Sequence, residues 1–157
     1  MTTNDVITQM EEIYSGNPWY GDSFSKILNN IKPENAVKKI APGGHTIVDI
    51  LYHIIAWRYF TIRQLQGDKE YDVKQNDKSD WKVIDYHKKD LWKDALSDFE
   101  DTHKMIIEEL HNFNNNKLDE KVPVRDYSYK YLISGLIQHD IYHLGQISLL
   151  SSTVSNI

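Results

Sequence analysis

Residues 87–113 read HKKDLWKDALSDFEDTHKMIIEELHNF, and this stretch carries the most regular helical pattern in the chain. Steps of four and three residues alternate without a slip along one set of side chains: Trp92, Leu96, Phe99, His103, Ile106, Leu110 and Phe113. An α-helix places residues at these steps on one face. The stretch therefore predicts a long amphipathic helix that packs its apolar face against other helices.

Two other long segments carry a similar stripe. In residues 46–66, Thr46 is a candidate N-cap with Asp49 three positions on, a variant of the capping box, and Gly67 ends the pattern. The stripe of this segment is Thr46, Ile50, His53, Trp57 and Phe60. In residues 128–151 the stripe is Leu132, Leu136, His139, His143, Gln146 and Leu150. Both segments predict long helices.

The N-terminal part of the chain predicts a fourth long helix over residues 19–31. Its stripe is Tyr20, Phe24, Ile27 and Ile31. Residues 5–14 also have helical character, but the breaker sequence SGNP at 15–18 separates them from this helix. Residues 32–44 hold two prolines and a Gly-Gly pair, which indicates a loop around one short helical turn. Residues 67–79 are polar without an apolar period, which indicates a connecting loop.

Four amphipathic helices without β-type alternation predict an all-α fold, an antiparallel four-helix bundle. A chain of 157 residues has the length of one ordinary domain, so we expect residues 1–157 to form a single helical-bundle domain. Bundles of this kind build ligand and metal sites from inward side chains on facing helices.

The composition narrows the chemistry. The chain has no cysteine, which excludes disulfides, thiolate metal ligands and a cysteine nucleophile. The formal net charge is −5 and the basic residues are scattered among acidic ones, which argues against nucleic acid as a partner. No segment approaches the ~20 apolar residues that span a bilayer, and the first residues lack a signal-peptide pattern. We therefore expect a cytoplasmic protein that does not enter a membrane.

Histidines occupy stripe positions where a bundle normally places leucine or isoleucine. A buried polar group without a partner costs a few kcal/mol, so something should compensate it. His139 and His143 stand four residues apart on one helix face, with Cβ atoms ~6 Å apart, and both imidazoles can reach one ion. His53 from a facing helix is the natural third ligand. Three imidazoles would leave one coordination position open, as in catalytic metal sites.

The other histidines carry less information. For His103 a core imidazole that donates to a neighbour, or supports a metal ligand, is favoured over a fourth ligand. His45, His87 and His111 lie at helix ends or off the stripes, where exposure or capping explains them.

Several neighbours of the histidines can be explained by structural roles as well as by functional ones. Asp140 makes an HDxxH motif that differs from the HExxH of metalloproteases in its shorter acid. Packing is the favoured role for Trp57, and the roles of Tyr142 and Gln146 stay open. Gly145 predicts a close helix contact, because glycine costs a helix about 1 kcal/mol relative to alanine.

Three stretches give the chain a family resemblance: MEEIYSGNPWYG at 10–21, PGGHTIVDILYHIIAWR at 42–58 and YLISGLIQHDIYHLGQISLL at 131–150. The chain resembles the DinB-like superfamily (DinB/YfiT-like bundles), a group that includes metal-dependent hydrolases and thiol S-transferases. The resemblance implies a four-helix bundle with zinc or nickel on His53, His139 and His143, and frequent homodimers.

The resemblance also implies an activity. Related transferases join a low-molecular-weight thiol such as bacillithiol or mycothiol to an electrophile, and here the thiol must arrive with a small-molecule substrate because the chain has no cysteine. The leading hypothesis is thus a metal-dependent thiol S-transferase or hydrolase, with no general base assigned. The alternative is a non-catalytic metal-binding or stress-response protein whose ion stabilises the bundle.

Overall fold

A computed structural model describes residues 1–155, which form helices and loops. The helices are α1 (Thr3–Ser15), α2 (Phe24–Leu28), α3 (Pro33–Ala36), α4 (Ile47–Leu65), α5 (Leu91–Asn112) and α6 (Tyr129–Val154), with a 3₁₀ turn at Asn115–Lys117. Within the described residues there is no strand, which confirms the all-α prediction. None of these helices combines the length and the apolar character that crossing a membrane requires.

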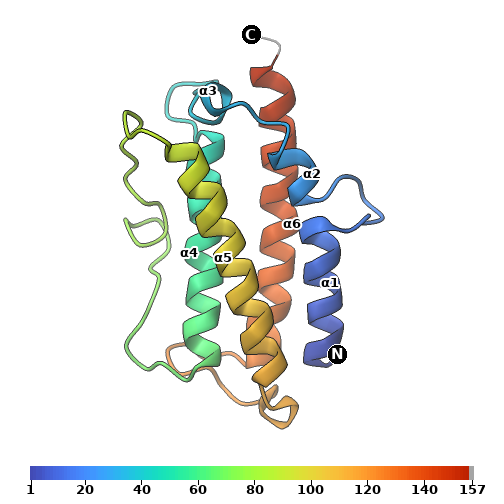
Figure 1. Cartoon of the computed structure of the whole chain (residues 1–157). Helices are drawn as coiled ribbons and strands as arrows, with labels where there is room; N and C mark the ends of the chain where they lie inside the picture. Colours follow the sequence, from blue (N-terminus) through green and yellow to red (C-terminus); the bar gives the residue numbers. More distant parts are fainter. Residues whose placement is uncertain (156–157) are drawn as a thin grey trace.

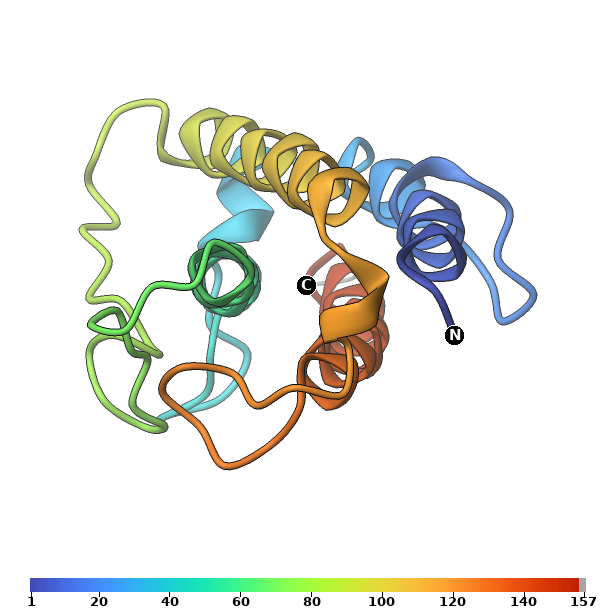
Figure 2. The ribbon, with the colours of Figure 1, turned by 90° about the horizontal axis from the view of Figure 1, so that it is seen from below.

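The four long helices form a bundle in which α1 and α4 each pack against both α5 and α6 (Figures 1 and 2). Helices α1 and α6 run in one direction along the bundle, whereas α4 and α5 run in the other (Figure 1). The α4/α6 and α1/α5 pairs are therefore antiparallel, as expected, but α4 and α5 are parallel. The reason is the long connection over residues 66–90, which returns along the outside of α4 before α5 begins (Figure 1).

The first long helix is α1, so the prediction of a long helix over residues 19–31 was wrong. Only Phe24–Leu28 of that segment is helical, and the bundle uses Thr3–Ser15 instead. Thr2 caps α1 in a capping box with Asp5, which stabilises its first turn. Gly21 adopts a φ of +144°, a conformation that a helix cannot include, so α2 starts only after it.

The ends of the site-bearing helices follow their capping residues. Thr46 Oγ1 accepts the Asp49 N–H at 3.2 Å and Asp49 Oδ2 accepts the Thr46 N–H at 2.8 Å, which confirms the predicted capping box of α4. Ser128 caps α6 by accepting the Tyr131 N–H. Helix α5 begins at Leu91, four residues later than predicted, because Asp90 has a left-handed φ of +61°.

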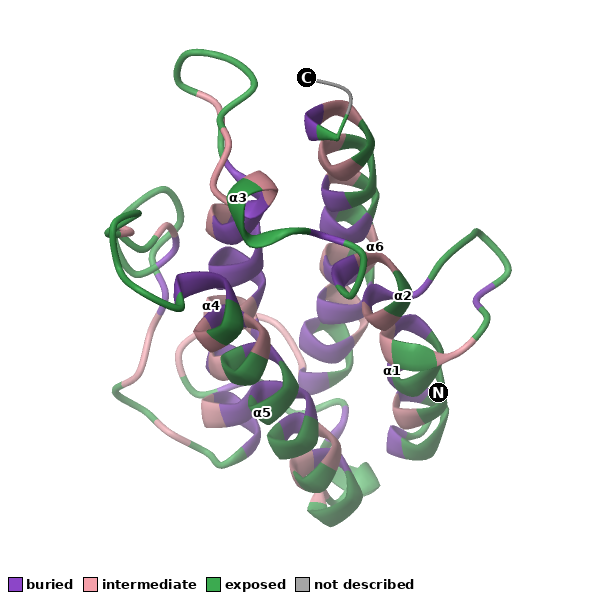
Figure 3. Cartoon of the chain, turned by 45° about the horizontal axis from the view of Figure 1, so that its top comes forward, coloured by how far each residue is buried: buried purple, intermediate pink, exposed green. Residues whose placement is uncertain are grey.

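Buried residues lie on the inward faces of the four long helices (Figure 3). The largest fully buried apolar residues include Phe24, Leu51, Phe60, Phe99, Ile106 and Ile133. The core also holds a buried ion pair: Arg58 is fully buried, and its Nε and Nη2 donate to Asp140 Oδ2 at 3.0 and 2.7 Å. This ion pair joins α4 to α6 next to the predicted metal ligand His139.

Candidate metal centre

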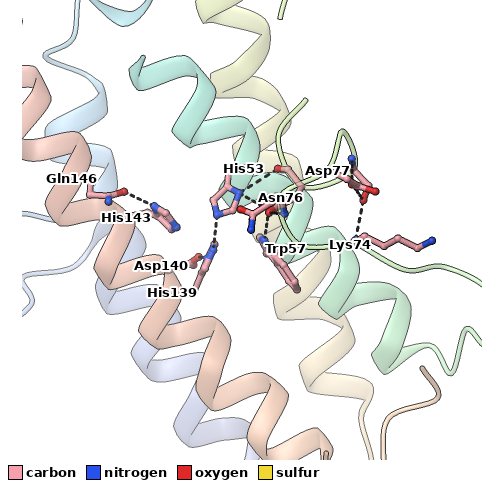
Figure 4. Close-up of polar contacts among 11 residues, drawn as sticks. His53, Trp57, Lys74, Asn76, Asp77, His139, Asp140, His143 and Gln146 are labelled. Atoms are coloured by element: carbon pink, nitrogen blue, oxygen red, sulfur yellow. Dashed lines mark hydrogen bonds and ion pairs between the residues drawn. The ribbon is translucent and has the colours of Figure 1, made fainter. Parts of the chain in front are cut away.

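The three histidines predicted as ligands come together between α4 and α6 (Figure 4). One nitrogen from each of His53, His139 and His143 lies within 4.8 Å of the other two. His139 Nε2 is 3.0 Å from His53 Nε2. His139 and His143 occupy successive turns of α6, and His53 reaches across from the middle of α4. Of the described residues, no other set of histidines and acids forms such a group.

Asp80 fixes the ring of His53. The Asp80 carboxylate Oδ1 is 2.7 Å from His53 Nδ1, and the Asp80 carbonyl oxygen is 3.2 Å from the same atom. Asp80 is itself buried and held by donors, because Trp57 Nε1–H and the Asn76 N–H bind its two carboxylate oxygens at 2.8 and 2.7 Å. His53 therefore carries its proton on Nδ1 and presents the lone pair of Nε2 to the other histidines.

Gln146 orients the ring of His143, as Asp80 orients that of His53. Its side-chain oxygen accepts a hydrogen bond from His143 Nδ1–H at 2.6 Å, which leaves Nε2 of this ring free. Burial lowers the pKa of His143 to about 4, and the neighbouring His139 contributes. Burial also lowers the pKa of His53 in spite of Asp80. Both rings are therefore neutral at neutral pH, which is the form that binds a metal ion.

The surroundings of His139 show whether a cation fits between the three histidines. Two nitrogens bound to one zinc ion lie ~3.4 Å apart in tetrahedral geometry, close to the 3.0 Å between the Nε2 atoms of His53 and His139. Without an ion, His139 must donate from Nε2 to His53, and its Nδ1 would then face Asp140 as a second acceptor. His139 Nδ1 and Asp140 Oδ1 are both buried without a hydrogen bond and lie 4.0 Å apart.

A cation held by His139 Nε2 would remove this conflict. The proton of His139 would then sit on Nδ1, so that Nδ1 and Asp140 Oδ1, 4.0 Å apart, would face each other as donor and acceptor. Asp140 is suited to that role, because the Arg58 charge holds its pKa below the usual range although burial alone would raise it. The residues present therefore fit a divalent cation.

The cluster borders a pocket of about 650 Å³. The lining residues, all within the described part of the chain, include no lysine and no arginine. Trp81 stacks on His53 with ring centroids 4.0 Å apart and on His45 at 3.7 Å. Tyr142 contacts His143 edge-on at 4.9 Å and is largely exposed, so it stands at the mouth. The pocket is thus a cleft without a cationic side chain, with imidazoles and the Asp80 carboxylate in its wall.

Comparison with known sequence families agrees with this fold. The sequence model of the DinB superfamily matches residues 21–147, which is most of the chain. The chain belongs to the DinB superfamily. No curated protein and no solved structure matches it.

In this DinB-superfamily protein, several residues at the histidine cluster are not predicted by the sequence pattern. Asp80 and Trp81 lie in the long α4–α5 connection, where no periodicity predicts burial; the tryptophan in a polar stretch was the only signal. His45, which its position near a helix end predicts to be exposed or capping, lines the pocket. Trp57, whose predicted role is packing, also donates a hydrogen bond to Asp80.

Other expectations about the site's neighbours have clear outcomes. His103 lies outside the cluster as predicted: it is a core imidazole stacked on Tyr14 at 3.8 Å, with Nε2 3.3 Å from Glu11. The close helix contact predicted at Gly145 was wrong, because a Cβ there would meet no atom within 4 Å.

Replacing Asp80 by asparagine is expected to weaken zinc binding by about 10- to 100-fold, the usual cost of losing the partner that orients a histidine ligand. Asparagine keeps an oxygen for the Trp57 indole but removes the charge beside His53 Nδ1. Calorimetric titration with zinc measures the effect. Asp77→Asn, an exposed change in the same loop, is the control. Equal affinities in the two variants would show that Asp80 does not orient the site.

Proposed function

We propose that this protein is a metal-dependent enzyme in which His53, His139 and His143 hold one divalent cation, zinc or nickel. One observation carries the proposal: one nitrogen of each of the three imidazoles lies within 4.8 Å of the other two, beside a pocket that admits a small molecule. Nδ1 of His53 and Nδ1 of His143 are already hydrogen-bonded, which leaves their Nε2 atoms for an ion. Only three donors form the cluster among the described residues, so one coordination position stays open.

The open position favours catalysis over a structural ion. Structural zinc sites are closed by a fourth protein ligand, whereas catalytic sites keep a place for substrate or water. When bound, the cation supplies Lewis acidity and lowers the pKa of a thiol or water beside it.

The protein's own residues prepare the site. Asp80 and Gln146 hold the imidazoles of His53 and His143 in the metal-binding tautomer, and Trp81 covers the face of His53.

Of the reactions open to such a site, we propose thiol S-transfer. The chain has no cysteine, so the sulfur comes from a low-molecular-weight thiol cosubstrate. The thiol gives its proton to solvent, its sulfur forms a bond to the electrophilic carbon of the second substrate, and the leaving group departs with the electron pair of the broken bond. Hydrolysis, with water in place of the thiol, is the second reaction that the same open position accommodates.

An assay of thiol conjugation tests this proposal. Zinc- or nickel-loaded protein, made without a His-tag, is mixed with bacillithiol, mycothiol or cysteine and a chlorinated fluorogenic electrophile, and product is followed by fluorescence. We expect a metal-dependent rate that falls at least about 100-fold in His53→Ala, because loss of the Lewis acid removes several kcal/mol of stabilisation. The proposal of S-transfer fails if the loaded wild-type protein does not exceed His53→Ala with any of these thiols. Ester hydrolysis under the same conditions then identifies the second reaction.

A further inference from the structure

A second, smaller pocket lies on the other side of the Trp57–His139 pair. Its volume is about 200 Å³. The lining residues are Trp57, Thr61, Tyr127, Tyr131, Leu132, Gly135, Leu136 and His139. Trp57 and His139 also line the large pocket, so a molecule in this side pocket contacts one of the proposed metal ligands directly.

The walls of the side pocket are uncharged and mostly apolar. Tyr127 and Tyr131 pack together with ring centroids 5.0 Å apart, and Tyr131 is 66% exposed, which places it at the entrance. No lysine, arginine, aspartate or glutamate lines the pocket. An ionised ligand would lose hydration here without meeting a Lys, Arg, Asp or Glu side chain of opposite charge, which favours a neutral occupant.

The volume sets the size of that occupant. A buried apolar cavity of about 150 Å³ in another protein holds one benzene molecule. A pocket of about 200 Å³ therefore accepts one aromatic ring with a small substituent, or a short branched aliphatic group.

We propose that the side pocket binds the uncharged aromatic or aliphatic group of the electrophilic substrate, while the thiol cosubstrate occupies the large pocket. This inference rests on the proposed function, because only a two-substrate reaction needs two pockets that meet at one metal ligand. The pockets share His139, so the two substrates approach the centre from different sides.

Gly135 opens the side pocket. It lies inside α6, its φ is not positive, and a Cβ there would meet no atom within 4 Å. A larger side chain can therefore enter the pocket without backbone strain, and its better helix propensity supports the fold. Gly145 is the matched control on the same helix: it is equally open but lines a different hollow, next to Tyr20.

Fluorine NMR with 4-fluorobenzyl alcohol as the probe tests the proposal. The probe is titrated into zinc-loaded wild-type protein, Gly135→Leu, Gly135→Ala and Gly145→Leu, and each dissociation constant is measured. We expect wild-type protein to bind the probe and Gly135→Leu to bind at least about tenfold more weakly, equivalent to 1.4 kcal/mol. Gly135→Ala should show a smaller loss and Gly145→Leu less than about a twofold change.

The inference is overturned if the probe does not bind, if Gly135→Leu binds as well as wild type, or if Gly145→Leu loses as much as Gly135→Leu. A zinc titration on the same samples separates this from the proposed function. Zinc binding without probe binding contradicts the side pocket alone. Probe binding that Gly135→Leu removes, in a chain that does not bind zinc, contradicts the metal enzyme alone.

Discussion

Replacing His143 by alanine is expected to lower the affinity for zinc by more than about 100-fold, because even the loss of a partner behind a ligand costs 10- to 100-fold. His143 supplies one of only three donors in the cluster, and its ring is buried, neutral and oriented by Gln146. Among the described residues, no other histidine or acid belongs to the cluster and could replace it. Calorimetric titration of chelator-treated, untagged protein measures the affinity.

The control for this change is His103→Gln. His103 is as buried as His143, but it lies on α5 with Tyr14 and Glu11 as neighbours, outside the cluster. We expect His103→Gln to bind zinc within about threefold of wild type. Circular dichroism checks that both variants keep the helical fold. Similar affinities in the His143 and His103 variants would contradict the assignment of the site.

Replacing Arg58 by methionine is expected to destabilise the fold by about 3–5 kcal/mol, which is the cost of leaving one partner of a buried ion pair uncompensated. The Arg58 guanidinium is fully buried, lies 4.1 Å from the centre of the Phe99 ring and donates twice to Asp140. Methionine fills similar space but leaves the Asp140 carboxylate without a cation. Urea unfolding of the metal-free protein measures the loss.

Two further variants make this prediction specific. Arg58→Met combined with Asp140→Leu removes both charges, and we expect it to recover most of the lost stability. Arg63→Met changes an arginine of the same helix that is 40% exposed and pairs with Asp68, so its cost should stay below about 1 kcal/mol. Equal losses in Arg58→Met and Arg63→Met would show that the buried pair is not a principal support of the bundle.

The helices that carry the cluster could be predicted because their signals are local. The Thr46–Asp49 capping box marks the start of α4, and the His139–His143 spacing already places two rings on one face of α6. The cost of a polar group in a stripe position made His53 the candidate third partner, and the family resemblance implied the same residue.

The remaining parts depend on contacts between distant segments. No local sequence pattern predicts that the α4–α5 connection folds back and places Asp80 against His53. The bundle uses α1 as its fourth long helix instead of residues 19–31, because the positive φ of Gly21 interrupts a helix there. Hydrophobic periodicity does not predict that backbone conformation. The sequence does indicate that Arg58 is unusual, because a charged residue four positions after Ile54 falls on an apolar helix face. Its partner Asp140 is 82 positions away, so the ion pair itself cannot be predicted from the local sequence.

Metal analysis of the chain, expressed without a His-tag and purified without nickel resin, tests the central claim most directly. Elemental analysis should find one zinc or nickel ion per chain in wild-type protein and almost none in His53→Ala. A substoichiometric metal content that His53→Ala leaves unchanged would contradict the three-histidine site and the function built on it.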